Sequence, residues 1–96
     1  MTPYQQALAV LQQAYDDADP RARQLCADRI DQAAASGDVE LIGKLQSALP
    51  AIGALAAAYD AASPETQAAF DERIDSARMS LNAAEIDALT AALLAS

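Results

Sequence analysis

Apolar residues in the first part of the chain recur at steps of three and four positions, the period of an α-helix with one buried side. These positions are Tyr4, Leu8, Leu11, Tyr15 and Ala18. Thr2 can cap the start of this helix, Pro3 suits its first turn, and Gln5 can complete a capping box. We therefore predict a helix from Pro3 to about residue 17.

Two further helix starts are marked by the same kind of residue pair, an N-cap side chain followed by proline. The pairs are Asp19-Pro20 and Ser63-Pro64. Proline is well suited to the first turn of a helix because its missing N–H has no partner there. Gly37 can end the helix that begins at Pro20, since glycine readily adopts the left-handed conformation that closes many helices.

Asp38 and Asn82 can each cap another helix, and Glu85 can complete a capping box with Asn82. Pro50 would cost a continuous helix about 3 kcal/mol, so we expect it to open a separate helix. The apolar stripe of that helix is Ile52, Leu55, Tyr59 and Ala62. The pattern predicts six helices and contains no strand signal.

The chain also resembles itself at an offset of 44 positions, with residues 7–50 aligning without a gap to residues 51–94. Sixteen of the 44 pairs are identical, and only five of the identities are alanine. The identical pairs include Tyr15 with Tyr59 and Pro20 with Pro64, and the run Arg29-Ile30-Asp31 recurs at residues 73–75. This self-similarity indicates a tandem duplication.

The predicted fold class is all-α, a six-helix bundle formed by tandem duplication of a three-helix unit with approximate internal two-fold symmetry. We expect one helical domain over residues 1–96, with repeat one at 7–50 and repeat two at 51–94. Two copies are too few for a solenoid, so the units are expected to pack face to face. Much of the 53% hydrophobic content is alanine, which predicts a thin core built on small contacts.

The net charge of the chain limits the classes of molecule that it can bind. Fourteen Asp and Glu residues against six Lys and Arg residues give a net charge of −8. This charge repels phosphate backbones and anionic lipid headgroups, so we expect no direct binding to nucleic acid or to membranes. The longest weakly polar stretch, Ala48 to Tyr59, is too short to span a bilayer. A basic protein partner is favoured, although an acidic surface also keeps a small protein soluble.

Several kinds of chemistry are absent. The chain has no histidine and three isolated glycines, so it lacks the usual catalytic base and any phosphate-binding loop. With a single cysteine and no signal-peptide pattern at the start, we expect a cytoplasmic protein. We predict neither an enzyme nor a protein that binds a metal or another cofactor.

Cys26 could be a reactive thiol, but it lies on an apolar stripe and its counterpart in the second repeat is Phe70. A core position is the preferred interpretation, because a phenyl ring cannot replace a thiolate. The acidic cluster of Asp16, Asp17 and Asp19 lacks the glycine and the distal glutamate of a calcium-binding loop. We therefore assign these aspartates to turn and capping roles.

Two pairs of repeated residues are expected to be structural. Tyr15 and Tyr59 are predicted to place their rings in the core and their hydroxyls at its edge, with a role as binding anchors as the alternative. Arg29 and Arg73 flank their stripes, so we expect their stems to pack against a neighbouring helix.

One acidic surface stands out on the helix that begins at Pro64. It comprises Glu65, Asp71, Glu72 and Asp75, with Asp60 just before the turn and only Arg78 nearby on that side. A solvated helix face is the alternative to a docking surface for a basic partner. We name these five carboxylates as the candidate partner-binding residues.

Small size, acidity and missing chemistry favour a non-enzymatic protein-interaction module, an acidic helical binder or inhibitor of a basic partner protein. A phage-type inhibitor such as an anti-CRISPR protein is one example of this class, by analogy of general properties alone. The alternative is a self-associating structural or scaffolding protein that uses apolar residues outside the main stripes. A homodimer is compatible with both hypotheses.

Overall fold

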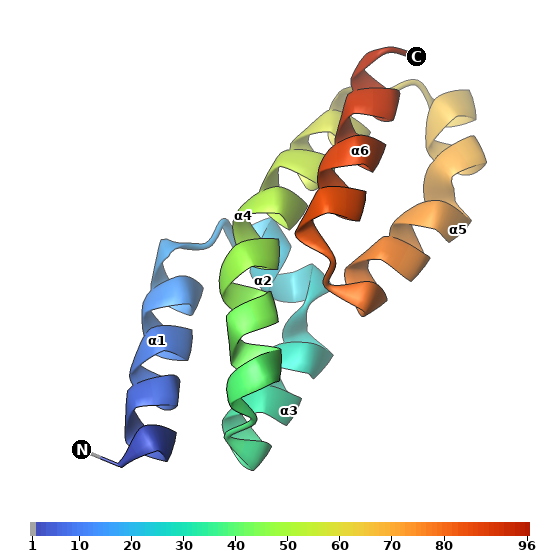
Figure 1. The fold of residues 1–96 in the computed structure, drawn as a ribbon. Coiled ribbons are helices and arrows are strands. Elements are labelled where there is room, and N and C mark those ends of the chain that lie inside the picture. Colours follow the sequence, from blue (N-terminus) through green and yellow to red (C-terminus); the bar gives the residue numbers. More distant parts are fainter. Residues whose placement is uncertain (1) are drawn as a thin grey trace.

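The computed structural model describes residues 2–96, and over this range its regular structure is entirely helical (Figure 1). Six helices follow in order: α1 (Pro3–Asp17), α2 (Pro20–Leu25), α3 (Ala27–Ser36), α4 (Val39–Ala61), α5 (Pro64–Ser80) and α6 (Ala83–Leu94). The predicted all-α class with six helices is confirmed. The division of the chain among these helices differs from the prediction at two places.

Most helices begin at the positions that the cap residues predicted. Thr2 and Gln5 form a reciprocal capping box at the start of α1. The side chains of Asp19 and Ser63 accept backbone hydrogen bonds at the starts of α2 and α5. The side chains of Asp38 and Asn82 do the same for α4 and α6.

The prediction that Pro50 opens a new helix is wrong. Pro50 lies on the exposed side of α4, which runs without interruption for 23 residues. Buried apolar residues flank it on both sides, namely Leu45, Leu49, Ile52 and Leu55. Each such side chain contributes about 1.5–3 kcal/mol on burial, so together they offset the roughly 3 kcal/mol that an internal proline costs.

The predicted second helix is instead divided. Between α2 and α3, Cys26 adopts φ −106° and ψ 11°, outside the helical region. The N–H of Cys26 still bonds to the Ala22 carbonyl at 3.1 Å, and its own carbonyl accepts from Ile30 at 2.9 Å. The chain therefore bends at Cys26 with few hydrogen bonds lost. One fusion and one division leave the total at six helices.

Helix α4 forms the axis of the molecule, which measures 48 × 20 × 19 Å. Figure 1 shows α1 and α3 beside the first part of α4, and α6 beside its last part with α5 next to α6. The two halves thus follow one another along a shared helix. The expected face-to-face packing about a two-fold axis is not confirmed, because the fused helix carries the second half onward in the same direction.

Local hydrogen bonds recur 44 residues apart. Arg23 Nε donates to the Tyr15 carbonyl at 2.7 Å, and Gln67 Nε2 donates to the Tyr59 carbonyl at 2.8 Å. These bonds add a second donor to carbonyls at the ends of α1 and α4, which also accept from the N–H groups of Ala18 and Ala62. The turns that lead into α2 and α5 are therefore held in the same way.

A second recurrence lies at the helix ends near residues 37 and 81. Among the described residues, only Gly37 (φ 65°) and Leu81 (φ 54°) have positive φ. Their N–H groups bond to the carbonyls of Ala33 and Ala77, both fully buried. A left-handed residue thus closes α3 and α5 at positions 44 residues apart.

We expect Gly37→Ala to lower the free energy of unfolding by about 1–3 kcal/mol. The new Cβ would be strained at φ 65° and would collide with the ring of Tyr4. Chemical denaturation measures the loss. Gly43→Ala is the matched control, because no side chain lies near Gly43, and should stabilise by about 0.5–1 kcal/mol. Equal stability of the Gly37→Ala variant and the native protein would contradict this account of the α3 end.

The length and composition of α4 would allow it to cross a membrane, with a mean hydropathy of 1.4 over its most apolar window. The expectation that the longest weakly polar stretch is too short to span a bilayer is therefore wrong, because the apolar helix extends beyond Ala48 to Tyr59 at both ends. Half of that window is buried within the bundle. Central helices of soluble proteins meet the same criterion, so this property assigns no membrane role.

Candidate interaction surface on helix α5

Helix α5 is the least covered of the long helices. Only Ala77 is buried within it, while Phe70 and Ile74 are half-buried. Its packing is mainly against α6, and its contact with α4 is slight. By contrast, nine residues of α4 are buried. Helix α5 therefore presents much of its side-chain surface to solvent.

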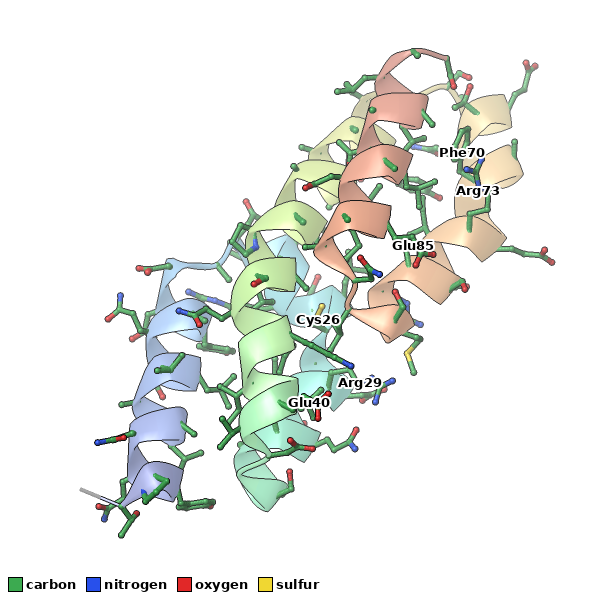
Figure 2. The ribbon with its side chains drawn as sticks, viewed as in Figure 1. Cys26, Arg29, Glu40, Phe70, Arg73 and Glu85 are labelled. Atoms are coloured by element: carbon green, nitrogen blue, oxygen red, sulfur yellow. The ribbon has the colours of Figure 1, made fainter. Side chains whose placement is uncertain are left out.

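Arginines hold the C-terminal end of α5 against the first half of the chain. Arg29 Nη2 donates to the Met79 carbonyl at 2.8 Å, and Arg78 Nη1 donates to the Leu25 carbonyl at 3.2 Å. A cation at the C-terminal end of a helix also interacts favourably with the helix dipole. Arg29, labelled in Figure 2, thus reaches a neighbouring helix through its guanidinium, whereas the prediction concerned the packing of its stem.

Arg73 behaves differently from its counterpart Arg29. Its guanidinium lies 4.9 Å from the centre of the Phe70 ring, within the range of a cation–π interaction. Figure 2 shows Phe70 and Arg73 between α5 and α6. The Arg73 side chain therefore packs on a residue of its own helix, whereas the prediction was packing against a neighbouring helix.

Three of the five predicted acidic residues have partners. Asp60 pairs with Arg21 at 3.1 Å, which joins α4 to α2. Asp75 pairs with Arg78 at 3.2 Å. All five are exposed, but Asp60 and Asp75 have nearby cations and contribute less unbalanced charge than predicted.

Asp71 accepts a hydrogen bond of 2.7 Å from the Tyr59 hydroxyl. The ring of Tyr59 is half-buried beside the core, as predicted. Tyr15 differs, because its side chain is 38% exposed and its ring lies under the Arg23 guanidinium at 4.6 Å. The first tyrosine therefore does not occupy the predicted core position.

Glu65 and Glu72 are the remaining members of the acidic surface. They lie seven residues apart, so at 100° per residue they project from nearly the same side of α5. Phe70, Ile74 and Ala77 face the opposite side. Among residues 2–96, neither glutamate has an ion-pair or hydrogen-bond partner for its side chain. We refer to Glu65 and Glu72 as the outward acidic pair.

The cations of the protein are mostly engaged within the fold. Arg23, Arg29 and Arg78 donate to backbone carbonyls, and Arg21 pairs with Asp60. Arginines used in this way stabilise helix ends and hold the halves together. The outer surface of α5 is consequently dominated by negative charge.

A groove of about 340 Å³ lies between α2, α4 and α5. Leu25, Leu55 and Ile74 give it an apolar floor, with Asp71 and Asp75 at its edge. The sequence did not predict this groove, because it depends on the separation of α5 from α4. The one available signal was that Ile74 and Leu55 belong to stripes on consecutive helices.

A similar groove of about 370 Å³ lies between α1 and α3. Its lining residues include Leu11, Tyr15, Ile30 and Asp31. Each stands 44 positions before a residue that lines the other groove, the four being Leu55, Tyr59, Ile74 and Asp75. Equivalent positions therefore line both grooves, although α2 of the first half also lines the groove beside α5.

Cys26 lies at the bend between α2 and α3 and is 1% exposed. Its predicted core position is confirmed. Burial raises the pKa of the Cys26 thiol above its ordinary value, and the nearby charge of Arg78 opposes this shift. The uncharged thiol is the favoured form in the fold, which suits a packing role.

The pKa of Tyr59 is also raised, chiefly by its hydrogen bond to Asp71, with burial adding to the effect. A raised pKa in the fold means that the unfolded chain loses its proton first, so stability is complete below the ordinary pKa and falls above it. We expect the free energy of unfolding to decline above about pH 9, first through Cys26 and then through Tyr59. Urea denaturation at pH 7 to 10.5 measures the decline, which should be smaller in Cys26→Ala and Tyr59→Phe.

In the acidic cluster near residue 17, Asp19 has the assigned capping role, whereas Asp16 and Asp17 belong to the last turn of α1. Asp19 caps α2 through the N–H of Arg21 at 2.8 Å. Asp16 and Asp17 each accept a hydrogen bond from a glutamine four residues earlier, at 2.9 and 3.0 Å. Over residues 2–96 the structure contains no group of three or more carboxylate or thiol ligands arranged to hold a metal ion.

Comparison with known proteins adds no relative. No protein-family model, curated protein or solved structure gives a significant match to this chain.

Proposed function

We propose that this protein is a non-enzymatic interaction module whose α5 surface docks onto a basic surface of a partner protein. The observation that carries the proposal is the unequal use of charge. Four arginines are engaged within the fold, whereas the outward acidic pair has no partner among the described residues. Charges left free on the outer side of α5 are available to a partner.

Electrostatics would act at two stages of this binding. The net charge of −8 steers a basic partner toward the protein before contact, and the outward acidic pair then orients it. An inhibitor that covers a basic groove would use the same properties, as a phage-type inhibitor such as an anti-CRISPR protein would. A cytoplasmic location suits such a role.

We also propose that the molecule arose by tandem duplication of a unit spanning residues 7–50 and 51–94. The recurring helix-end hydrogen bonds, the paired left-handed residues and the two equivalent grooves support this origin. On this view the second unit has specialised, because it carries a net charge of −5 against −3 for the first.

A tagged form of the protein can be used to isolate the partner from cells that naturally produce it. The affinity of the purified pair is then measured at about 50 and 300 mM salt. Electrostatic docking predicts binding that weakens at least about tenfold over this range, because salt screens charges that are exposed before contact. Binding of equal strength at both concentrations would contradict the proposal.

Self-association is the second candidate function, and one observation favours it. Leu94, at the end of α6, is 71% exposed, which is unusual for a large apolar side chain. Met79 and Val10 are also exposed, at 44% and 38%, whereas Leu81, another apolar residue outside the main stripes, is buried. Light scattering at about 100 µM decides between a monomer and a homodimer.

A further inference from the structure

In the molecule, α4 packs against one side of α2. Arg21 pairs with Asp60 of α4 at 3.1 Å. A Cβ atom placed on Gly53 would lie 3.5 Å from the Cβ of Asp19, so α4 passes close to the start of α2. Leu25 and Ala56 line the same groove. On α4, Asp60 thus pairs with an arginine of α2, Gly53 passes close to the cap of α2, and Ala56 lines a groove together with Leu25.

The equivalent side of α5 has no such cover. The position 44 residues after Arg21 is Glu65, and the position 44 residues after Leu25 is Ala69. Glu65 and Ala69 are both exposed, whereas Leu25 is half-buried. One further pair of equivalent positions agrees, because Ala22 is fully buried while its counterpart Thr66 is only half-buried. This side of α5 also carries Glu72, so it coincides with the outward acidic pair.

We propose that this open side of α5 receives an amphipathic α-helix of the partner protein, packed as α4 packs against α2. This inference deepens the function proposed above and rests on it. The arriving helix would present small or apolar residues where α4 has Gly53 and Ala56. It would carry Lys or Arg where α4 has Asp60, because Glu65 replaces Arg21 and the charges across the contact are exchanged.

The size of the facing residues adds a second requirement. Ala69 is smaller than its counterpart Leu25, which leaves more room on α5 than on α2. A larger apolar side chain on the arriving helix, at the position of Ala56, fills that space. The recognised feature is thus a helix with a leucine-sized residue and a basic residue four positions later.

A second copy of this protein fits the site poorly. The element equivalent to the last part of α4 is α1, which carries Asp16 where α4 carries Asp60. Docking α1 of another copy would place Asp16 opposite Glu65. Like charges at such a distance repel each other, so a foreign basic helix is favoured over self-association.

The test uses the full-length protein and helix-stabilised synthetic peptides of residues 50–62, stapled on the side away from α2. One peptide carries Ala56→Leu and Asp60→Arg, and the second carries Ala56→Leu alone. We expect the arginine peptide to bind at least about tenfold more tightly than the aspartate peptide, measured by fluorescence anisotropy at low salt. The Glu65→Arg protein should reverse this preference, while circular dichroism checks that it remains folded.

Equal binding of the two peptides, or no binding of the arginine peptide at millimolar concentration, would overturn the helix-docking inference. Self-association of the native protein that is lost in Ala69→Arg would overturn it as well, by identifying a second copy as the occupant. These outcomes are separate from failure of the proposed function. If partner binding is sensitive to salt but unaffected by Ala69→Arg, the proposal of a basic partner stands and the inference of a docked helix is overturned.

Discussion

Ile52→Ala is expected to lower the free energy of unfolding by about 2–5 kcal/mol. Ile52 is fully buried, and it lies just after the point where the two halves of the molecule meet on α4. Because α4 contributes to the core of both halves, loss of this contact should weaken them together. Thermal denaturation should therefore show a single transition at a lower temperature, by circular dichroism and by calorimetry.

Val39→Ala is the matched control for this truncation. Val39 begins the same helix but is 62% exposed, so its change should stay within about 0.5 kcal/mol. Two separate transitions in the Ile52→Ala protein would show that the halves unfold independently, against the role assigned to α4.

Reversal of the outward acidic pair, by Glu65→Lys together with Glu72→Lys, should weaken partner binding by about 10- to 100-fold, or about 1.4–2.7 kcal/mol. Each reversal replaces an attraction to the basic partner with a repulsion. Stability should change by less than about 1 kcal/mol, because neither glutamate contributes to packing. Surface plasmon resonance measures the affinity and thermal melting the stability. Asp75 is left unchanged because its substitution would remove the ion-pair partner of Arg78.

The control carries Glu40→Lys and Asp87→Lys. Glu40 lies in the first turn of α4 as Glu65 does in α5, and Asp87 is an exposed carboxylate of α6, so the change in net charge is the same. We expect the control to bind nearly as well as the native protein. If both variants lose affinity equally, total charge rather than the α5 surface governs binding.

The local features of this fold could be predicted from the sequence because they depend on nearby residues. The cap residues at Thr2, Asp19 and Ser63 act within three positions of themselves, and each formed the expected hydrogen bond. The fusion at Pro50 and the bend at Cys26 depend instead on which surfaces become buried. Helix propensity favours a break at Pro50, and tertiary packing reverses that preference.

In the candidate site, too, local features could be predicted from the sequence and long-range contacts could not. Its five carboxylates could be identified from helical periodicity, and all five are exposed. Their partners could not be identified, because Asp60 meets an arginine 39 residues away and Asp71 meets a tyrosine on the preceding helix. The groove beside α5 was also beyond prediction, since it reflects how far two helices separate. The structure thus narrows the acidic surface to Glu65 and Glu72.

Hydrogen–deuterium exchange of the complex measures directly whether α5 is the surface that meets a basic partner. Helix α5 has little covering it, so its amides should exchange faster than those of α4 in the free protein. Binding is predicted to slow exchange across residues 64–80 more than in any other segment. Slowed exchange confined to α1 and α3, with α5 unchanged, would contradict the claim.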